Sequence, residues 1–143
     1  MTNKEIFENV FTSFDFIGKY CKNYTKSEFE ENLILMDAVA YRLYSIGTVA
    51  ENIIVSKLEK DEIILVNQLI EFKSVFSNPN FKIRLLSDLV YDNQLGELFS
   101  RIFFLLIDKY EPNTKKAVGK DKLSRDYKYP IISTNSIWTV KKR

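Results

Sequence analysis

Apolar residues recur at intervals of three and four through most of the first 110 positions, which is the spacing of amphipathic α-helices. The pattern predicts five helices, over about residues 4–22, 27–57, 60–76, 79–91 and 94–110. In the last range apolar residues cover most of the helix circumference, so this helix is expected at the centre of the fold or, through residues such as Phe103, at an oligomer contact. The expected fold class is therefore all-α, an up-and-down bundle of four to five helices.

Short polar segments mark the predicted helix ends. Thr2 with Glu5, and Ser27 with Glu30, have the spacing of a capping box, in which two side chains satisfy backbone amides at a helix start. The segment 77–80 places a proline at the first position of the fourth helix, where its missing N–H costs no hydrogen bond. With only four glycines and three prolines in 143 residues, long helices fit the composition better than a many-turned β fold.

The second predicted helix contains a glycine, Gly47, in its interior. Glycine costs a helix about 1 kcal/mol relative to alanine, so its presence calls for a reason. Gly47 and Ala50 lie three residues apart on one helix face and together form a patch of small residues. The patch predicts a close helix contact, either inside the core or at a dimer interface.

Helical periodicity stops after residue 110, and the charge changes sign at the same place. Residues 1–110 carry twelve basic and sixteen acidic side chains, whereas residues 111–143 carry nine basic and three acidic ones. We therefore divide the chain into a helical bundle, 1–110, and a basic C-terminal extension, 111–143, which is expected to meet a polyanion or an acidic protein, or to be a solvated end. The basic residues of the extension are Lys115, Lys116, Lys120, Lys122, Arg125, Lys128, Lys141, Lys142 and Arg143.

The end of the extension has a different pattern. Residues 129–143 contain β-branched runs on both sides of the Thr134–Asn135–Ser136 segment, which suggests a short β-hairpin or an edge strand. Trp138, the single tryptophan of the chain, lies in this segment and is predicted to contact the bundle or a partner, the latter by strand addition.

The composition excludes several kinds of chemistry. The chain has no histidine, which removes Ser-His-Asp and Cys-His catalysis and histidine metal sites. A single cysteine, Cys21, rules out an internal disulfide and makes a zinc site very improbable; with no histidine to activate it, an ordinary half-buried thiol is expected. No metal and no cofactor are therefore expected. No apolar run reaches the roughly 18 residues that span a bilayer, so we expect a cytoplasmic protein with no membrane partner.

The second predicted helix also resembles a known family. Its segments Asp37–Val39, Arg42–Leu43 and Ile46–Gly47, followed by Ala50, match in order a pattern of the HepT-like group of HEPN domains. Thr48 stands where that family usually has glutamate, and the resemblance covers about the first 110 residues, weakly after Ile54. It implies a dimeric α-helical bundle of a bacterial toxin–antitoxin system, in which the HEPN protein cleaves RNA and a nucleotidyltransferase antitoxin neutralises it.

The signature of this family is an arginine, usually followed by asparagine, then a histidine and, two residues later, often a tyrosine that accepts AMP from the antitoxin. The placement that fits best makes Arg84 the arginine and Tyr91 the tyrosine, a candidate for modification; Leu85 and Leu89 stand where asparagine and histidine are expected. A second placement, which fits less well, uses Arg101, Asp108 and Tyr110. Both lack the histidine.

Leucine cannot move a proton, and arginine is too basic to accept one near neutral pH. We therefore expect a non-catalytic HEPN-like protein of a toxin–antitoxin or phage-defence system. It is expected to be a dimer and to bind RNA, a nucleotidyltransferase-type partner or a larger defence complex. Arg84 is a candidate phosphate contact. One alternative is an active ribonuclease that uses Arg84, Asp88 and Tyr91. The plainest interpretation of Arg84 and Asp88 is a helical ion pair. Another alternative is a structural subunit or inhibitor of a larger nucleoprotein machine.

Overall fold

The computed structural model describes residues 1–77, 83–110 and 137–138. Within these ranges all regular secondary structure is helical, which confirms the all-α prediction. The predicted hairpin falls almost entirely outside the described residues. The elements are α1 (Asn3–Cys21), α2 (Lys26–Glu30), α3 (Leu33–Ala50), the 3-10 helix η1 (Val55–Lys57), α4 (Lys60–Ile70), the 3-10 helix η2 (Glu71–Ser74), α5 (Ile83–Tyr91) and α6 (Gln94–Tyr110).

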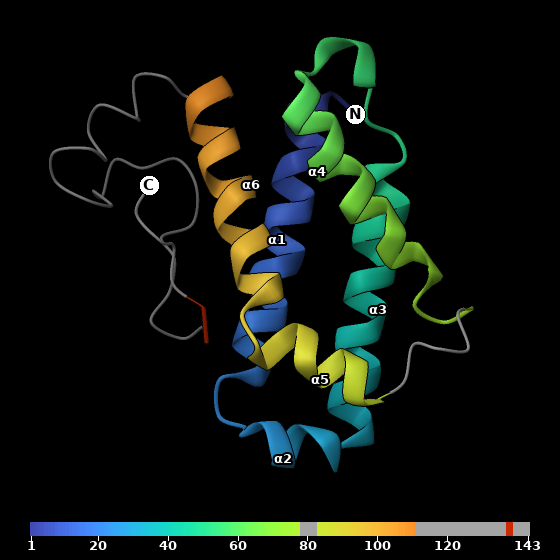
Figure 1. Cartoon of the computed structure of the whole chain (residues 1–143), viewed down its shortest axis with the longest axis vertical. Coiled ribbons are helices and arrows are strands. Elements are labelled where there is room, and N and C mark those ends of the chain that lie inside the picture. The colour runs from blue at the N-terminus through green and yellow to red at the C-terminus, as the bar shows by residue number, and fades with distance from the viewer. Residues whose placement is uncertain (78–82, 111–136, 139–143) are drawn as a thin grey trace, which may run out of the picture.

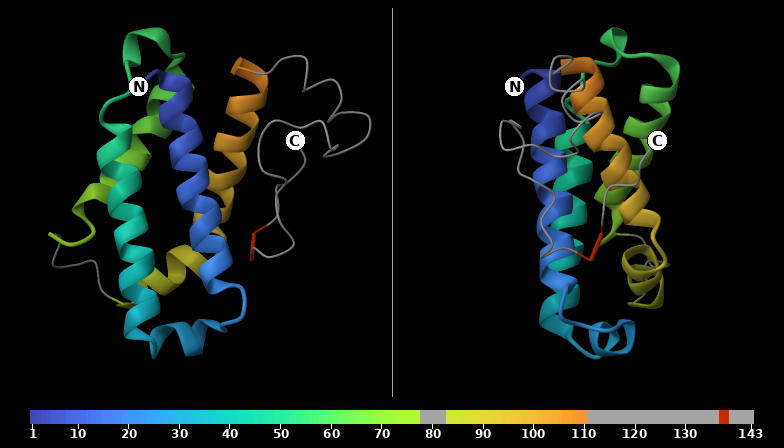
Figure 2. Two further views of the ribbon diagram at one scale, coloured as in Figure 1. Left: turned by 180° about the vertical axis from the view of Figure 1, so that it is seen from behind. Right: turned by 90° about the vertical axis from the view of Figure 1, so that its left-hand side faces the viewer.

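Three long helices, α1, α3 and α6, form the body of the bundle. Figures 1 and 2 show α1 between the other two and antiparallel to both, with α2 and α5 closing the end at which α1 finishes. The central helix is thus α1, while α6 packs at its side.

Phenylalanines of α1 form the middle of the core. Phe7, Phe11 and Phe14 follow the helical repeat and are at most 1% exposed. The ring of Phe11 stacks on Phe99 of α6 with centroids 4.9 Å apart and lies 6.0 Å from Phe103. Burying each such side chain contributes roughly 1.5–3 kcal/mol, so the α1–α6 contact is a principal source of stability.

The second predicted helix is divided in the structure. Residues 26–30 form α2, and a new helix, α3, begins after Asn32, whose side chain accepts a hydrogen bond from the Leu35 amide at 3.0 Å. The capping box predicted for Ser27 and Glu30 is wrong. Thr25 and Glu28 form it instead, because Thr25 has the extended backbone that a helix cap requires.

Helix α3 ends at Ala50, seven residues before the predicted end at Lys57. The side chain of Asn3 explains how the chain leaves the helix there. Its amide nitrogen donates to the Ile54 carbonyl at 3.0 Å, and its oxygen accepts from the Ile54 amide at 2.8 Å. Both backbone groups of Ile54 are thereby satisfied outside a helix, and the following residues tighten into η1.

Gly47 lies where η2 crosses α3. A Cβ at this position would overlap the backbone nitrogen of Lys73 and lie 2.9 Å from its Cα. The predicted third helix, 60–76, accordingly ends as an α-helix at Ile70 and continues as the tighter η2. The patch of Gly47 and Ala50 therefore serves a close contact inside the chain, one of the two alternatives that the sequence leaves open.

The last two helices agree with the sequence pattern. Helix α6 has the predicted bounds, 94–110, and α5 ends at the predicted Tyr91. Residues 78–82, with the predicted start of that helix, lie outside the described residues. Asn93 makes the sharp turn between α5 and α6 with a left-handed backbone, at φ 68°, a conformation that asparagine tolerates better than most side chains.

Candidate functional site

The predicted signature residues Arg84, Asp88 and Tyr91 all belong to α5, and their spacing of four and three residues places them on one helix face. The side chain of Arg84 lies outside the described part of the structure. Leu85 is exposed and Leu89 is half-buried. Because both are leucines, neither offers a polar group where the family signature has one.

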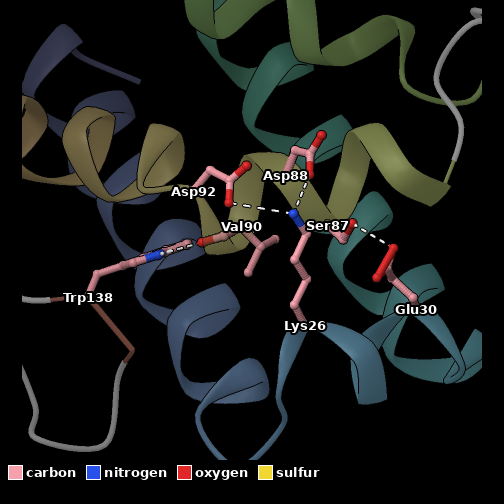
Figure 3. Close-up of polar contacts among 7 residues, drawn as sticks. All are labelled: Lys26, Glu30, Ser87, Asp88, Val90, Asp92 and Trp138. Atoms are coloured by element: carbon pink, nitrogen blue, oxygen red, sulfur yellow. Dashed lines mark hydrogen bonds and ion pairs between the residues drawn. The ribbon is translucent and has the colours of Figure 1, made fainter.

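Asp88 joins α5 to α2. Lys26 of α2 extends its ammonium group between two carboxylates of the α5 region, with the nitrogen 2.5 Å from Asp88 and 3.5 Å from Asp92 (Figure 3). The hydrogen bond with Asp88 raises the pKa of Lys26, which is therefore a cation at neutral pH. Ser87, the residue before Asp88, donates from its hydroxyl to the carboxylate of Glu30 at 3.3 Å, one turn along α2 from Lys26. These contacts hold two helices together.

Tyr91 faces inward from the end of α5. Its hydroxyl donates to the carbonyl of Tyr24 at 2.9 Å, and its ring meets the edge of Phe29 with centroids 5.6 Å apart. Burial, followed by the neighbouring thiol of Cys21, raises the pKa of Tyr91 well above its usual range. The phenol is therefore neutral near pH 7 and is used as a donor to the backbone.

Cys21 is fully buried at the end of α1. Burial raises the pKa of its thiol to about 12, with an opposing effect from its hydrogen bond with Tyr91. Since the thiolate is the reactive form of cysteine, this residue cannot serve as a nucleophile near neutral pH. The thiol predicted to be half-buried is completely enclosed.

Trp138 lies in a pocket formed by α1, α5 and α6. Its indole nitrogen donates to the carbonyl of Val90 at 3.2 Å (Figure 3), and a Cβ at Gly96 would lie 3.0 Å from its ring. Its ring centroid is 6.5 Å from Phe14 and 6.0 Å from Phe99, and only 4% of the residue is exposed. Trp138 thus forms part of the core, which the sequence offers as one of two alternatives for this residue.

Arg101 and Asp108, from the second placement of the signature, lie on α6 and line an open groove of about 890 Å³ between α4 and α6. A hydrogen bond and an ion pair connect α6 to α4 here. Arg101 donates to the side chain of Gln68 at 3.0 Å, and Lys109 lies 2.8 Å from the carboxylate of Glu62. Lys109 and Glu62 are absent from the sequence-based candidates, because only the packing of α6 beside α4 brings them together.

Tyr110, the tyrosine of this second placement, is half-buried at the end of α6. Its ring lies 6.5 Å from Phe7 of α1, and burial raises the pKa of its hydroxyl above the ordinary value. Asp108 is exposed in the groove beside it. No imidazole accompanies either residue, so the groove provides charged groups for binding and lacks the usual acid–base group of an RNA-cleaving enzyme.

The remaining predicted residues fall into two groups. Gly47, Ala50, Phe103 and Trp138 are buried by contacts within this chain, and their role at an interface with another chain stays a prediction. The basic residues of the extension lie outside the described residues: Lys115, Lys116, Lys120, Lys122, Arg125, Lys128, Lys141, Lys142 and Arg143.

Helix α3 is also the one described helix that is long and apolar enough to span a membrane by length and composition. The core helix of a soluble protein has the same properties, and α3 packs its core face against α1 and η2. Within the described ranges no group of three potential metal ligands comes together.

Comparison with protein-family models, with curated proteins and with solved structures gave no match. The assignment to the HepT-like HEPN family therefore rests on the residue pattern of α3 and on the spacing in α5, and it stays a proposal.

Proposed function

We propose that this protein is a non-catalytic HEPN-like subunit of a bacterial toxin–antitoxin or phage-defence system, and that it acts as a dimer that binds RNA or a protein partner. The pattern Asp37–Val39, Arg42–Leu43 and Ile46–Gly47 supports the family. The all-α architecture is the one that the resemblance implies.

The observation that carries the non-catalytic part is the engagement of the two remaining acid–base candidates. Asp88 pairs with Lys26, and the Tyr91 hydroxyl is donated to the Tyr24 carbonyl. A group that accepts a proton from an RNA hydroxyl near neutral pH must be deprotonated and within reach of it. Tyr91 is neutral at that pH, and Asp88 already serves the α2–α5 contact. Each therefore has a structural role that explains its presence.

An RNA-cleavage assay tests this proposal. Purified protein incubated with total RNA is expected to leave it intact, in the presence and absence of added divalent cations. The Arg84→Ala variant, which removes the signature arginine, should behave identically. Cleavage by the natural chain that disappears in Arg84→Ala would overturn the non-catalytic proposal and favour the active-ribonuclease alternative.

The basic extension supplies the charge for RNA binding. We expect a full-length variant with Lys115, Lys116, Lys120 and Lys122 changed to glutamine to bind single-stranded RNA more weakly. In the natural chain each phosphate contact contributes roughly 0.7 to the slope of log affinity against log salt concentration, so the slope of the variant should decrease. A variant with the exposed Lys57 and Lys60 changed to glutamine is the control for the loss of positive charge from the helical bundle. Equal slopes for all three proteins would favour a protein partner over RNA.

The resemblance further implies a nucleotidyltransferase that modifies Tyr91. Because the Tyr91 hydroxyl is bonded to the Tyr24 carbonyl, transfer of a nucleotide to it requires that bond to open first. Intact-mass measurement after incubation with a candidate nucleotidyltransferase and ATP tests this part. A mass increase that Tyr91→Phe abolishes supports it, and an unchanged mass contradicts it.

A further inference from the structure

A row of large apolar side chains lies exposed along α3. Its members, which we call the α3 stripe, are Leu33, Ile34, Tyr41 and Tyr44 of α3 with Phe76, which follows η2. Their exposed fractions range from 40% at Tyr44 to 84% at Ile34. Phe76 joins the row because its ring centroid lies 5.8 Å from that of Tyr44.

Helix geometry explains why these residues form one surface. At 100° per residue, the four stripe positions of α3 fall within about a third of the helix circumference. The core positions, including Val39, Leu43 and Ile46, lie on the opposite side and are fully buried. Helix α3 borders the bundle on the side away from α6, as Figures 1 and 2 show. The stripe thus lies on the side of α3 opposite its buried core residues.

We propose that the α3 stripe binds the same stripe of a second copy of this chain, with the two α3 helices antiparallel about a two-fold axis at the level of Val39. Ile34 of one copy then lies opposite Tyr44 of the other. The inference rests on the dimeric state proposed above and identifies its surface. A two-fold dimer uses one patch twice, so the patch must complement itself.

The area of the stripe fits a dimer. With about 200 Å² for each fully exposed large side chain, five residues exposed by 40–84% present about 600 Å². A standard interface buries roughly 800 Å² on each partner, and the neighbouring half-buried residues of α3 can supply the remainder. Apolar patches of several hundred Å² on soluble proteins commonly mark interaction sites.

The polar groups of the stripe also complement themselves. Between Leu33 and Tyr44, the one charged residue of α3 that is exposed is Asp37. In an antiparallel pair about this axis, residue 37 of one copy lies opposite residue 41 of the other. Asp37 therefore faces Tyr41 of the second copy, whose hydroxyl group can donate a hydrogen bond to it. No lysine or arginine lies in the row, so it offers nothing to the phosphates of RNA or of an anionic membrane.

The candidates that the sequence gives for an oligomer contact lie elsewhere. Phe103 on α6 and Gly47 on α3 are buried against other parts of the same chain. Tyrosine and phenylalanine, which dominate the exposed stripe, are enriched in protein interfaces because their rings bury a large area at little entropic cost. The α3 stripe, in contrast, is exposed, and it lies beside the Gly47 contact on the same helix.

Molar-mass measurement across a concentration series tests the proposal. The natural full-length chain should be a dimer at micromolar concentration, and Ile34→Lys should weaken the dimer at least tenfold, since it brings two cations close to the apolar contact. Ile64→Lys is the matched control, because Ile64 of α4 is also exposed, at 52%, but lies outside the stripe. Circular dichroism should show the same helix content in all three proteins.

Cross-linking tests the position of the axis. Cys21 is buried and does not react, so the thiol of Tyr41→Cys is the only accessible one. A short bis-maleimide should link two copies of Tyr41→Cys and should fail to link Ile64→Cys.

Each outcome has a separate meaning. A natural chain that stays monomeric at 100 μM would overturn both the stripe and the dimeric part of the proposed function, leaving its RNA-cleavage and RNA-binding tests unaffected. A dimer that Ile34→Lys leaves intact, without cross-linking at position 41, would overturn the stripe and keep the dimer. A monomer that gains stable binding to uncharged lipid vesicles through the stripe would identify a membrane surface as its occupant instead.

Discussion

At the scale of single residues, the missing side chain of Gly47 permits the backbone contact between α3 and η2. A methyl group there would overlap backbone atoms of Lys73, which cannot rotate away as a side chain tip can. The glycine costs helix stability, about 1 kcal/mol relative to alanine, and the packing of η2 on α3 more than offsets this cost.

Gly47→Ala is therefore expected to destabilise the protein although alanine is the better helix former. Overpacking of a tight contact costs roughly 1–3 kcal/mol, and this exceeds the gain in helix propensity. Urea unfolding followed by circular dichroism measures the difference. Thr48→Ala, at the neighbouring half-buried position, is the control and should change stability by less than about 0.5 kcal/mol. A Gly47→Ala protein more stable than the natural one would contradict the close crossing.

Cys21 makes stability depend on alkaline pH. Its thiol has a pKa of about 12 in the folded chain, raised by burial, whereas an unfolded thiol has a pKa of about 8.5. Between about pH 9 and 12 the unfolded chain therefore binds fewer protons than the folded one, and folded stability falls as pH rises. One such group contributes a slope of up to about 1.4 kcal/mol per pH unit.

Urea unfolding at pH 8, 9 and 10 tests this dependence. The natural chain should lose stability with a steeper slope than Cys21→Ala, in which Tyr91 and Tyr110 keep their partly buried hydroxyls but the thiol is gone. Identical slopes in the two proteins would show that the Cys21 thiol ionises as readily in the folded chain as in the unfolded one.

At the scale of elements, helix interiors follow from the apolar repeat, but helix ends depend on distant side chains. The end of α6 was predictable from the break in periodicity after Tyr110. The end of α3 was not, because Asn3, from the first turn of α1, forms both hydrogen bonds that hold the Ile54 backbone outside a helix. Such a contact between residues 51 positions apart leaves no trace in the local pattern.

Asn3→Ala should consequently destabilise the protein by about 1–3 kcal/mol. The Ile54 amide loses its acceptor, and the Ile54 carbonyl loses the shorter of its two hydrogen bonds and keeps the one from the Lys57 amide at 3.3 Å. Chemical denaturation measures the loss, and faster hydrogen exchange of the Ile54 amide would locate it. Asn9→Ala, at an exposed position of the same helix, provides the comparison and should be nearly neutral. Equal stability of the two variants would mean that the Asn3 contacts contribute little.

At the scale of the whole molecule, Trp138 connects the end of the chain to the bundle. The amide of Ile137 donates to the Gly18 carbonyl at 3.2 Å, and the indole fills the pocket beside Gly96. Residues far apart in sequence thus share one core, although the division at residue 110 stays a prediction from periodicity and charge.

Trp138→Ala should lower stability by about 3–5 kcal/mol, the usual cost of removing a large buried aromatic side chain. Trp138→Phe keeps a ring but loses the bond to Val90, so a smaller loss of about 1–3 kcal/mol is expected. Because Trp138 is the only tryptophan, its fluorescence also reports its environment directly. Emission should be blue-shifted and protected from acrylamide in the folded chain; full quenching before unfolding would contradict the docked position.

The sequence by itself determined that residues 1–77 and 83–110 fold into helices and where most of these helices lie, because apolar spacing is a local property that directly encodes a buried helix face. It also determined the absence of imidazole chemistry, since composition does not depend on folding. Only the tertiary structure decided that α1 is central, that Gly47 meets Lys73, and that Asp88 pairs with Lys26, because each depends on which helices become neighbours. The same holds for the α3 stripe: an apolar residue is exposed only when no other element covers it, and the repeat alone does not say which faces are covered.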